Sequence, residues 1–230
     1  SQRLKYEQYL DSWREAGFEV SVSPFWDESS WRVLFQPGRW LRKGMGFVRG
    51  LLRRVRDLSA IRGADLVYLH LEAIPLGPPL LERWIARQGI PMIYDIDDLV
   101  YLPHSSAANP FMRFVRRVRG RGKVSELIRM AAHTVVCTEH LAAYAREWTD
   151  RVTNITSTID TDTYRPRPHR THARGVVVGW SGSHSTSRYL HLLDDVLVAL
   201  QRDEAIRIKV IGDGSFHIDG ATVEASEWAL

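Results

Sequence analysis

The chain has 230 residues, of which 44% are hydrophobic, and a formal net charge of +4. This length and composition exclude a disordered chain and allow one large or two smaller globular domains. The sequence predicts neither a membrane-spanning helix nor a signal peptide, because it has no long apolar window and no basic-then-apolar leader. The single cysteine, Cys137, cannot form an internal disulfide, so we expect it to pack as a small buried residue in a reducing cytoplasm.

Hydrophobic periodicity predicts alternating helices and strands over most of the chain. Residues 4–16 have apolar side chains at helical spacing and end at Gly17, a residue typical of helix C-termini. A strand is expected next, over residues 18–22. Further strands are predicted at 65–69, 91–94, 134–137 and 152–155, and helices around residue 51 and over 80–87, 124–132 and 141–148. The alternation favours an α/β fold with a Rossmann-like, doubly wound parallel sheet.

Periodicity is lost between residues 161 and 172, where two prolines and many polar residues indicate an interdomain connection. We therefore predict a first Rossmann-like domain over residues 1–158, a hinge over 159–173, and the first part of a second such domain over 174–230. The hinge residues His169 and His172 lack acidic or cysteine partners at suitable spacing. A solvated linker is favoured there over a metal pair.

At the start of the second domain, the sequence pattern predicts a strand, a loop, a helix and a second strand in immediate succession. The first strand runs into a loop that contains Gly179, Ser181, Gly182 and Ser183, and the second ends in Gly212-Asp213-Gly214. A small, hydroxyl-rich loop before a helix presents free backbone amides, which bind phosphate well. The alternative is that these glycines only form turns, as they do in many α/β proteins.

Basic residues are clustered although the net charge is small. One cluster runs from residue 39 to 56 and another from 113 to 123, both without an acidic residue. Bulky apolar side chains are interleaved with them at helical spacing, which is typical of a helix on an anionic membrane surface. The cations expected there are Arg49, Arg53, Arg54, Arg113, Arg116 and Arg117. A solvated helix face is the alternative, and nucleic acid is disfavoured because no motif supports it.

Four segments resemble the retaining glycosyltransferases built from two Rossmann-like domains, the GT-B type of group 1 or family 4. They are residues 9–20, the strand end at 94–98, the hinge at 159–166, and the loops at 179–190 and 211–214. The resemblance implies a metal-independent hexosyltransferase that acts in polysaccharide or glycolipid biosynthesis. It would transfer a sugar from a nucleoside diphosphate sugar, with retention, to a carbohydrate or lipid-linked acceptor. It also implies a truncation at both ends, with a strand before Ser1 and a longer second domain after Leu230.

The resemblance assigns the donor to the second domain. Its donor-binding residues would be Gly179, Ser181, Gly182, Ser183, Arg188, Gly212 and Gly214. Glycines there would let the backbone approach the diphosphate, and serine hydroxyls and a cation would stabilise its charge. The alternative for Arg188 is an ordinary position on the surface of the helix.

The resemblance assigns the acceptor to the first domain, where Asp95 and Asp97 are the candidate catalytic residues. Together with Asp98 they place three carboxylates within one short segment, so at least one should be exposed, paired or raised in pKa. They either orient an acceptor hydroxyl or, in the case of Asp97 and Asp98, cap the next turn. Their Asp-x-Asp pattern is not interpreted as a metal site, so no metal and no cofactor other than the donor substrate is expected.

Other polar residues follow neighbouring strands and would face the same cleft. The candidate acceptor-side residues are His70, Glu72, Asp98 and Glu139, each with a structural role as the alternative. Two further functions stay open, a nucleotide-sugar epimerase and a non-catalytic binding protein that retains the fold. We expect a cytoplasmic protein, peripheral at the inner face of the membrane, with no nucleic-acid partner.

Overall fold

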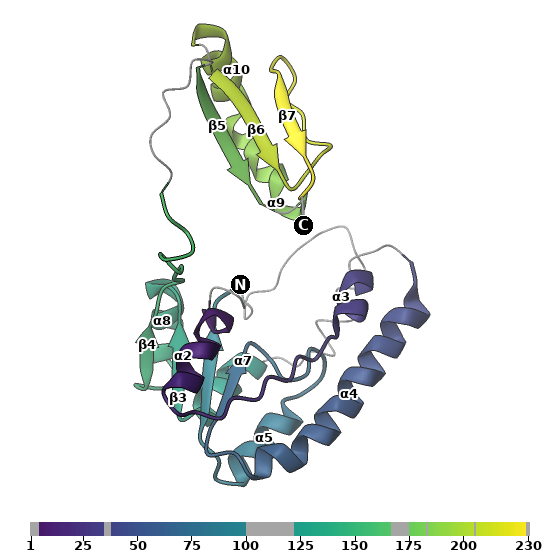
Figure 1. Ribbon diagram of the computed structural model, residues 1–230, viewed down its shortest axis with the longest axis vertical. Coiled ribbons are helices and arrows are strands. Elements are labelled where there is room, and N and C mark those ends of the chain that lie inside the picture. Colours follow the sequence, from purple (N-terminus) through teal and green to yellow (C-terminus); the bar gives the residue numbers. More distant parts are fainter. Residues whose placement is uncertain are drawn as a thin grey trace. The chain divides into compact units, whose positions relative to one another are not determined.

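The computed structural model describes residues 5–34, 38–99, 122–166, 175–182, 184–204 and 206–228, with 184 and 185 described in their backbone alone. The chain divides into two compact units, Ser1–Tyr164 and Arg165–Leu230 (Figure 1). Several residues singled out in the sequence lie outside the described ranges. They are Arg113, Arg116, Arg117, His169, His172 and Ser183.

The first unit contains a four-stranded sheet in which all strands are parallel. Its order is β1 (Val67–His70), β2 (Met92–Ile96), β3 (His133–Val136) and β4 (Val152–Asn154). The connecting helices are α5 (Leu80–Arg87), α7 (Lys123–Met130) and α8 (Glu139–Arg146). Parallel strands need such crossovers, because a tight turn cannot return the chain to the same end of the sheet. The predicted α/β class with parallel Rossmann-like sheets is confirmed.

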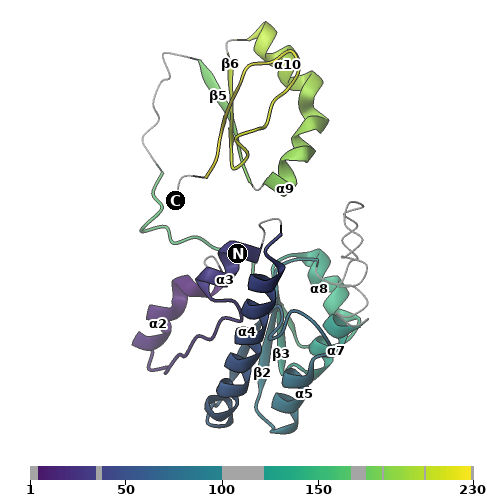
Figure 2. The same cartoon turned by 90° about the vertical axis from the view of Figure 1, so that its right-hand side faces the viewer.

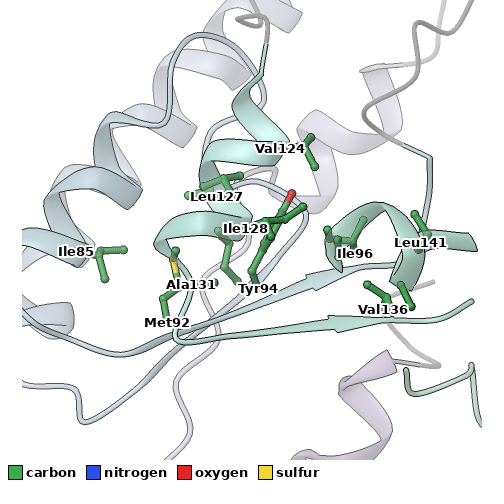
Figure 3. Close-up of a cluster of buried hydrophobic side chains, with 14 of the residues drawn as sticks. Ile85, Met92, Tyr94, Ile96, Val124, Leu127, Ile128, Ala131, Val136 and Leu141 are labelled. Atoms are coloured by element: carbon green, nitrogen blue, oxygen red, sulfur yellow. The ribbon is translucent and has the colours of Figure 1, made fainter. Parts of the chain in front are cut away.

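One face of this sheet forms the main core, shown in Figure 3. Tyr94 and Ile96 of β2 and Val136 of β3 are fully buried against Leu127 and Ile128 of α7. These three strand residues alternate with others that face the opposite side, as the two-residue period of a strand requires. The core therefore fixes which strand side chains face away from it.

The opposite face is covered by the N-terminal segment, which consists of η1 (Glu7–Tyr9) and α2 (Leu10–Glu15). The rings of Tyr6 and Trp13 lie 5.9 and 6.2 Å from the ring of Tyr68 on β1. The strand predicted over residues 18–22 is wrong. Alternating apolar residues suggested it, but the segment is mostly exposed and pairs with no strand among the described residues.

Two further helices extend the first unit, α3 (Glu28–Leu34) and the long α4 (Trp40–Arg62). Figure 2 shows α4 along its length. Two buried glycines of α4 allow a close approach, Gly46 to α3 and Gly50 to the segment before α3. A Cβ atom on Gly46 would lie 2.7 Å from Oγ of Ser30, and one on Gly50 would lie 2.6 Å from the ring of Phe25. No described helix combines the length and the apolar character needed to cross a bilayer.

The second unit is a three-stranded parallel sheet of β5 (Val176–Ser181), β6 (Ile206–Ile211) and β7 (Val223–Ser226). The connection from β5 to β6 consists of α9 (His184–Ser187), η2 (Arg188–Leu193) and α10 (Asp194–Asp203). Its core contains Leu197, Ile208, Val210, Phe216 and Ile218. This is the strand–helix–strand unit that the sequence predicts.

Candidate functional site

In the first unit, ionisable side chains gather at the carboxyl end of the parallel sheet, the edge at which open α/β sheets bind ligands. His70 is the last residue of β1, and Asp97 directly follows β2. Nε2 of His70 lies 3.3 Å from Oδ2 of Asp97, and the two side chains are only 6% and 7% exposed. The carboxylate lies beside the imidazole ring, but Nε2 of His70 has no hydrogen-bond partner among the described residues. The structure thus brings together one predicted catalytic candidate and one predicted acceptor-side residue.

The other catalytic candidate, Asp95, is fully buried. Nζ of Lys5 lies 3.2 Å from its Oδ1, and the hydroxyl of Tyr68 donates a 2.6 Å hydrogen bond to its Oδ2. Burial, together with this hydrogen bond, raises the pKa of Tyr68, so the phenol stays protonated. Asp95 therefore ties the N-terminal segment to the sheet, and its carboxylate is enclosed by protein groups.

The third carboxylate, Asp98, is exposed, and its Oδ1 accepts a 2.7 Å hydrogen bond from the amide of Leu99. Asp95 and Asp97 are paired with cationic or ionisable partners instead. The three neighbouring carboxylates are thus separated into two paired groups and one solvated group, as their mutual repulsion requires. The hydrogen bond of Asp98 is local, and the choice between an acceptor-side and a turn-capping role stays open.

Glu72 belongs to a second buried cluster, in the loop between β1 and α5. Its Oε2 lies 3.4 Å from Nζ of Lys123, which also donates a 2.7 Å hydrogen bond to the carbonyl of Ile74. Glu82 accepts a hydrogen bond from the amide of Ala73, and burial raises the pKa of Glu82. These contacts hold the loop beside the edge where His70 lies, and the acceptor-side role of Glu72 stays a prediction.

Glu139 begins α8, just after β3, and is exposed. Its Oε1 accepts a 2.8 Å hydrogen bond from Nδ2 of Asn154, and its Oε2 lies 3.5 Å from Nη1 of Arg146. The hydrogen bond from Asn154 and, less strongly, the charge of Arg146 lower the pKa of Glu139. The side chain therefore presents an ionised carboxylate at the same end of the sheet.

Several side chains that contact the predicted site residues were not identified from the sequence. Lys5, Tyr68 and Lys123 pair with predicted residues, and the thiol of Cys137 donates a 3.3 Å hydrogen bond to the carbonyl of Asp97. Burial raises the pKa of Cys137, which keeps it a thiol. Tyr68 could have been identified, because strand residues two apart share a face and it precedes His70 by two. Nothing in the sequence placed the distant Lys5 or Lys123.

In the second unit the strand β5 continues to Ser181, so Gly179 lies inside a strand and not in a loop. A Cβ atom on Gly179 would meet nothing within 4 Å. The amides of Gly182, Gly212 and Gly214 donate to the carbonyl of Ile211, the carbonyl of Ser226 and Oε1 of Glu227, respectively. These three amides are therefore engaged within the protein.

Gly212 is required by a close approach of two loops. Its φ is +108°, and a Cβ atom there would lie 1.8 Å from the carbonyl oxygen of Gly182. The same oxygen accepts a 3.1 Å hydrogen bond from Nε1 of Trp228. A side chain at Gly182 would in turn overlap the ring of Trp180. Close packing within the unit explains both glycines.

The remaining donor-side candidates differ in their surroundings. Ser181 and Arg188 are exposed, and the guanidinium of Arg188 lies 4.9 Å from the ring centre of Tyr189. Asp213, which the sequence analysis did not select, is buried and accepts a 2.5 Å hydrogen bond from Oγ of Ser187. It links the turn after β6 to the end of α9.

The arginines of α4 fall into two groups. Arg53 donates to the carbonyls of Pro24 and Phe25, and Arg54 donates to the carbonyl of Ala73 and to Asp57. Arg53 and Arg54 thus hold neighbouring segments together, and their guanidinium groups are directed to these intramolecular partners. Arg49, one turn before Arg53, is exposed.

No group of three or more His, Cys, Asp or Glu side chains suited to a metal ion occurs in the part of the chain that the structure describes. The ion pairs reported above are contacts between side chains of the protein.

No protein-family model and no curated protein matches the chain. Among solved structures, the chain is similar to the crystal structure of TarM, with 12% sequence identity and a TM-score of 0.48. The match covers 78% of this chain and 36% of TarM, so the chain spans about a third of the length of that protein. A likeness at this level assigns neither an activity nor a substrate to the chain.

Proposed function

We propose that the chain is part of a retaining glycosyltransferase that uses a nucleoside diphosphate sugar as its donor. The observation that carries the proposal is the buried pair of His70 and Asp97, at the carboxyl end of a parallel sheet. The resemblance of the sequence to the two-domain transferases supplies the donor class. The first unit would hold the acceptor, which is a carbohydrate or a lipid-linked group, and the second unit would hold the donor.

His70 is the residue that we propose acts on the acceptor. A neutral imidazole beside a carboxylate can take a hydrogen bond from a sugar hydroxyl and orient it for attack. Asp97 would position the ring without touching the substrate, and Glu139 would offer an exposed carboxylate for further hydroxyls. No protein nucleophile is required, because stabilisation of the leaving diphosphate supplies most of the catalysis.

On the donor side we propose roles for Ser181 and Arg188, which are exposed near the end of β5 and at the start of η2. The engaged amides of Gly182, Gly212 and Gly214 are better explained by packing, so they are proposed as the floor of the site and not as phosphate donors. The reaction would take place in the cytoplasm, at the inner face of a membrane.

A second candidate is a non-catalytic carbohydrate-binding protein, and the engaged glycine amides favour it. Release of free nucleoside diphosphate distinguishes the two. The full chain is incubated with uridine and guanosine diphosphate sugars, with and without a mixture of oligosaccharides and membrane lipids. A transferase releases the diphosphate faster when the acceptor mixture is present. A binding protein releases none under either condition, and that result would overturn the proposal.

A further inference from the structure

We propose that one face of α4 is a docking surface for an anionic lipid bilayer. This inference rests on the proposed function, because the surface would hold the enzyme at the membrane where a lipid-linked acceptor lies. Binding to vesicles needs neither donor nor catalysis, so the docking surface and the transferase activity can fail independently.

The apolar part of this face is a continuous stripe along α4. Its members are Leu41, Met45, Val48, Leu52 and Val55, all of which are exposed. They recur at alternating steps of four and three residues, which places them on one side of a helix. The stripe is about 21 Å long at 1.5 Å per residue. Leu41 is 91% exposed and Val55 is 64% exposed, so the stripe is a bare surface of the unit.

The opposite side of α4 is already occupied, which fixes the direction in which the stripe points. Gly46 and Gly50 are buried against the segment from Phe25 to Ser30, and Leu58 packs on the main core. Arg53 and Arg54 hold the same side through hydrogen bonds to backbone carbonyls. The helix cannot turn to bury the stripe without breaking these contacts.

Arginines flank the stripe on one side. Arg42, Arg49 and Arg56 each follow the stripe residues Leu41, Val48 and Val55, and all three are exposed. The only acid within α4 is Asp57, which pairs with Arg54. Trp40, at the start of the helix, is also exposed, and aromatic rings of this kind are favoured at membrane interfaces. An apolar stripe beside uncompensated cations matches a surface of acyl chains and anionic headgroups.

A second copy of the chain fits this face less well than lipid does. Two stripes packed antiparallel would bring the two rows of arginines together, and like charges at such positions disfavour pairing. Two stripes packed parallel would offer these arginines no acid, because Asp57 of α4 already pairs with Arg54. An anionic bilayer instead offers opposite charge to Arg42, Arg49 and Arg56. Charge complementarity therefore selects lipid as the occupant.

Flotation of the full chain with vesicles tests the proposal. One set of vesicles contains equal parts of phosphatidylcholine and phosphatidylglycerol, and the other contains phosphatidylcholine only. Two variants alter the surface, the triple change Arg42→Ala, Arg49→Ala, Arg56→Ala and the double change Leu41→Ser, Leu52→Ser. The matched control removes three exposed cations elsewhere, through Arg87→Ala, Arg151→Ala and Lys209→Ala. Circular dichroism establishes that each variant is folded.

We expect the unaltered chain to float with the anionic vesicles and not with the neutral ones. Both surface variants should bind the anionic vesicles about tenfold more weakly or worse, since each basic residue near such a surface adds attraction. The control should bind nearly as well as the unaltered chain. Equal losses in the control and the arginine variant would overturn the proposal, as would absence of binding by the unaltered chain. A dimer in solution that the double serine variant disrupts would also overturn it, because the stripe would then bind protein.

Discussion

Nε2 of His70 and Oδ2 of Asp97 lie 3.3 Å apart although the two residues come from different strands. The pairing of β1 with β2 produces this contact. His70 lies opposite Asp95, and Asp97, two residues further on, lies on the same face just beyond the end of β1. Both side chains are nearly buried, and Nε2 of His70 has no hydrogen-bond partner among the described residues. We propose this pair as the acceptor site of the first unit.

Replacing His70 should impair transfer while leaving donor binding intact. We expect His70→Ala to lower kcat by about 100-fold, the usual size of a lost acid–base contribution. Asp97→Asn should cause a smaller loss, because it weakens the orientation of a ring that remains present. The KM for the nucleotide sugar should not change in either variant. Initial rates measured over a range of donor concentrations separate the two effects.

The matched control for this experiment is His133→Ala, which removes a histidine from the opposite, amino end of the sheet. Its rate should stay close to that of the unaltered chain. Loss of activity in the His133 variant equal to that in the His70 variant would show that the His70 effect is one of stability alone.

The second unit should depend on Gly212 and not on Gly179. A Cβ atom on residue 212 would lie 1.8 Å from the carbonyl oxygen of Gly182, at a φ that side chains rarely adopt. We expect Gly212→Ala to cost about 2 kcal/mol or more of unit stability. Gly179→Ala meets open space and should be neutral or slightly stabilising. Hydrogen exchange of the amides in β5 and β6 reports both, and equal protection in the two variants would contradict the packing described here.

The two glycines of α4 offer a similar comparison in the first unit. Gly50→Ala would place a methyl group 2.6 Å from the ring of Phe25, so we expect a loss of about 2 kcal/mol from overpacking. Gly44 has nothing within 4 Å, and Gly44→Ala should stabilise the helix by up to about 1 kcal/mol. Urea unfolding of each variant gives the free energy of unfolding. The account of α4 is wrong if Gly50→Ala proves as stable as Gly44→Ala.

Glu82 should make the stability of the first unit depend on pH. Burial raises the pKa of Glu82 above its ordinary value of 4.5, so the folded state binds this proton more tightly than the unfolded state does. The contribution of Glu82 to the free energy of unfolding is fully present below pH 4.5. It is lost as the pH rises through the raised pKa of the folded state. Glu82→Gln should therefore match the unaltered chain in stability at about pH 4 and exceed it at neutral pH. A constant difference between the two proteins over this range would contradict the assignment.

Much of the fold could be predicted from the sequence, because its strands are short apolar runs between helical patterns. The predicted strand at 91–94 corresponds to β2, and the predicted helix at 80–87 is α5 with the same bounds. The strand at 18–22 was predicted wrongly, since alternation alone does not reveal whether a pairing partner exists. Gly179 was placed in a loop because glycine suggests turns, whereas β5 tolerates it through pairing with β6.

The candidate site was predictable only in part. The strand ends pointed to His70 and Asp97, since polar residues after buried strands meet at one edge of a parallel sheet. The partners of the other candidates lie far away in the chain, as Lys5 does from Asp95 and Lys123 from Glu72. Local patterns carry no information on such contacts. The structure also separates the engaged arginines of α4 from the exposed ones. In the sequence, Arg49 and Arg54 both appear as basic residues of one amphipathic helix, and only packing distinguishes them.

Transfer of label from the donor to the acceptor tests the central claim most directly. The full chain is incubated with a nucleoside diphosphate sugar that is isotopically labelled in its sugar, together with the acceptor mixture, and the products are separated and examined by NMR. We expect the label to appear in the acceptor fraction with the anomeric configuration that it had in the donor. Label that remains in the donor, appears only as free sugar, or arrives with inverted configuration would contradict a retaining transferase.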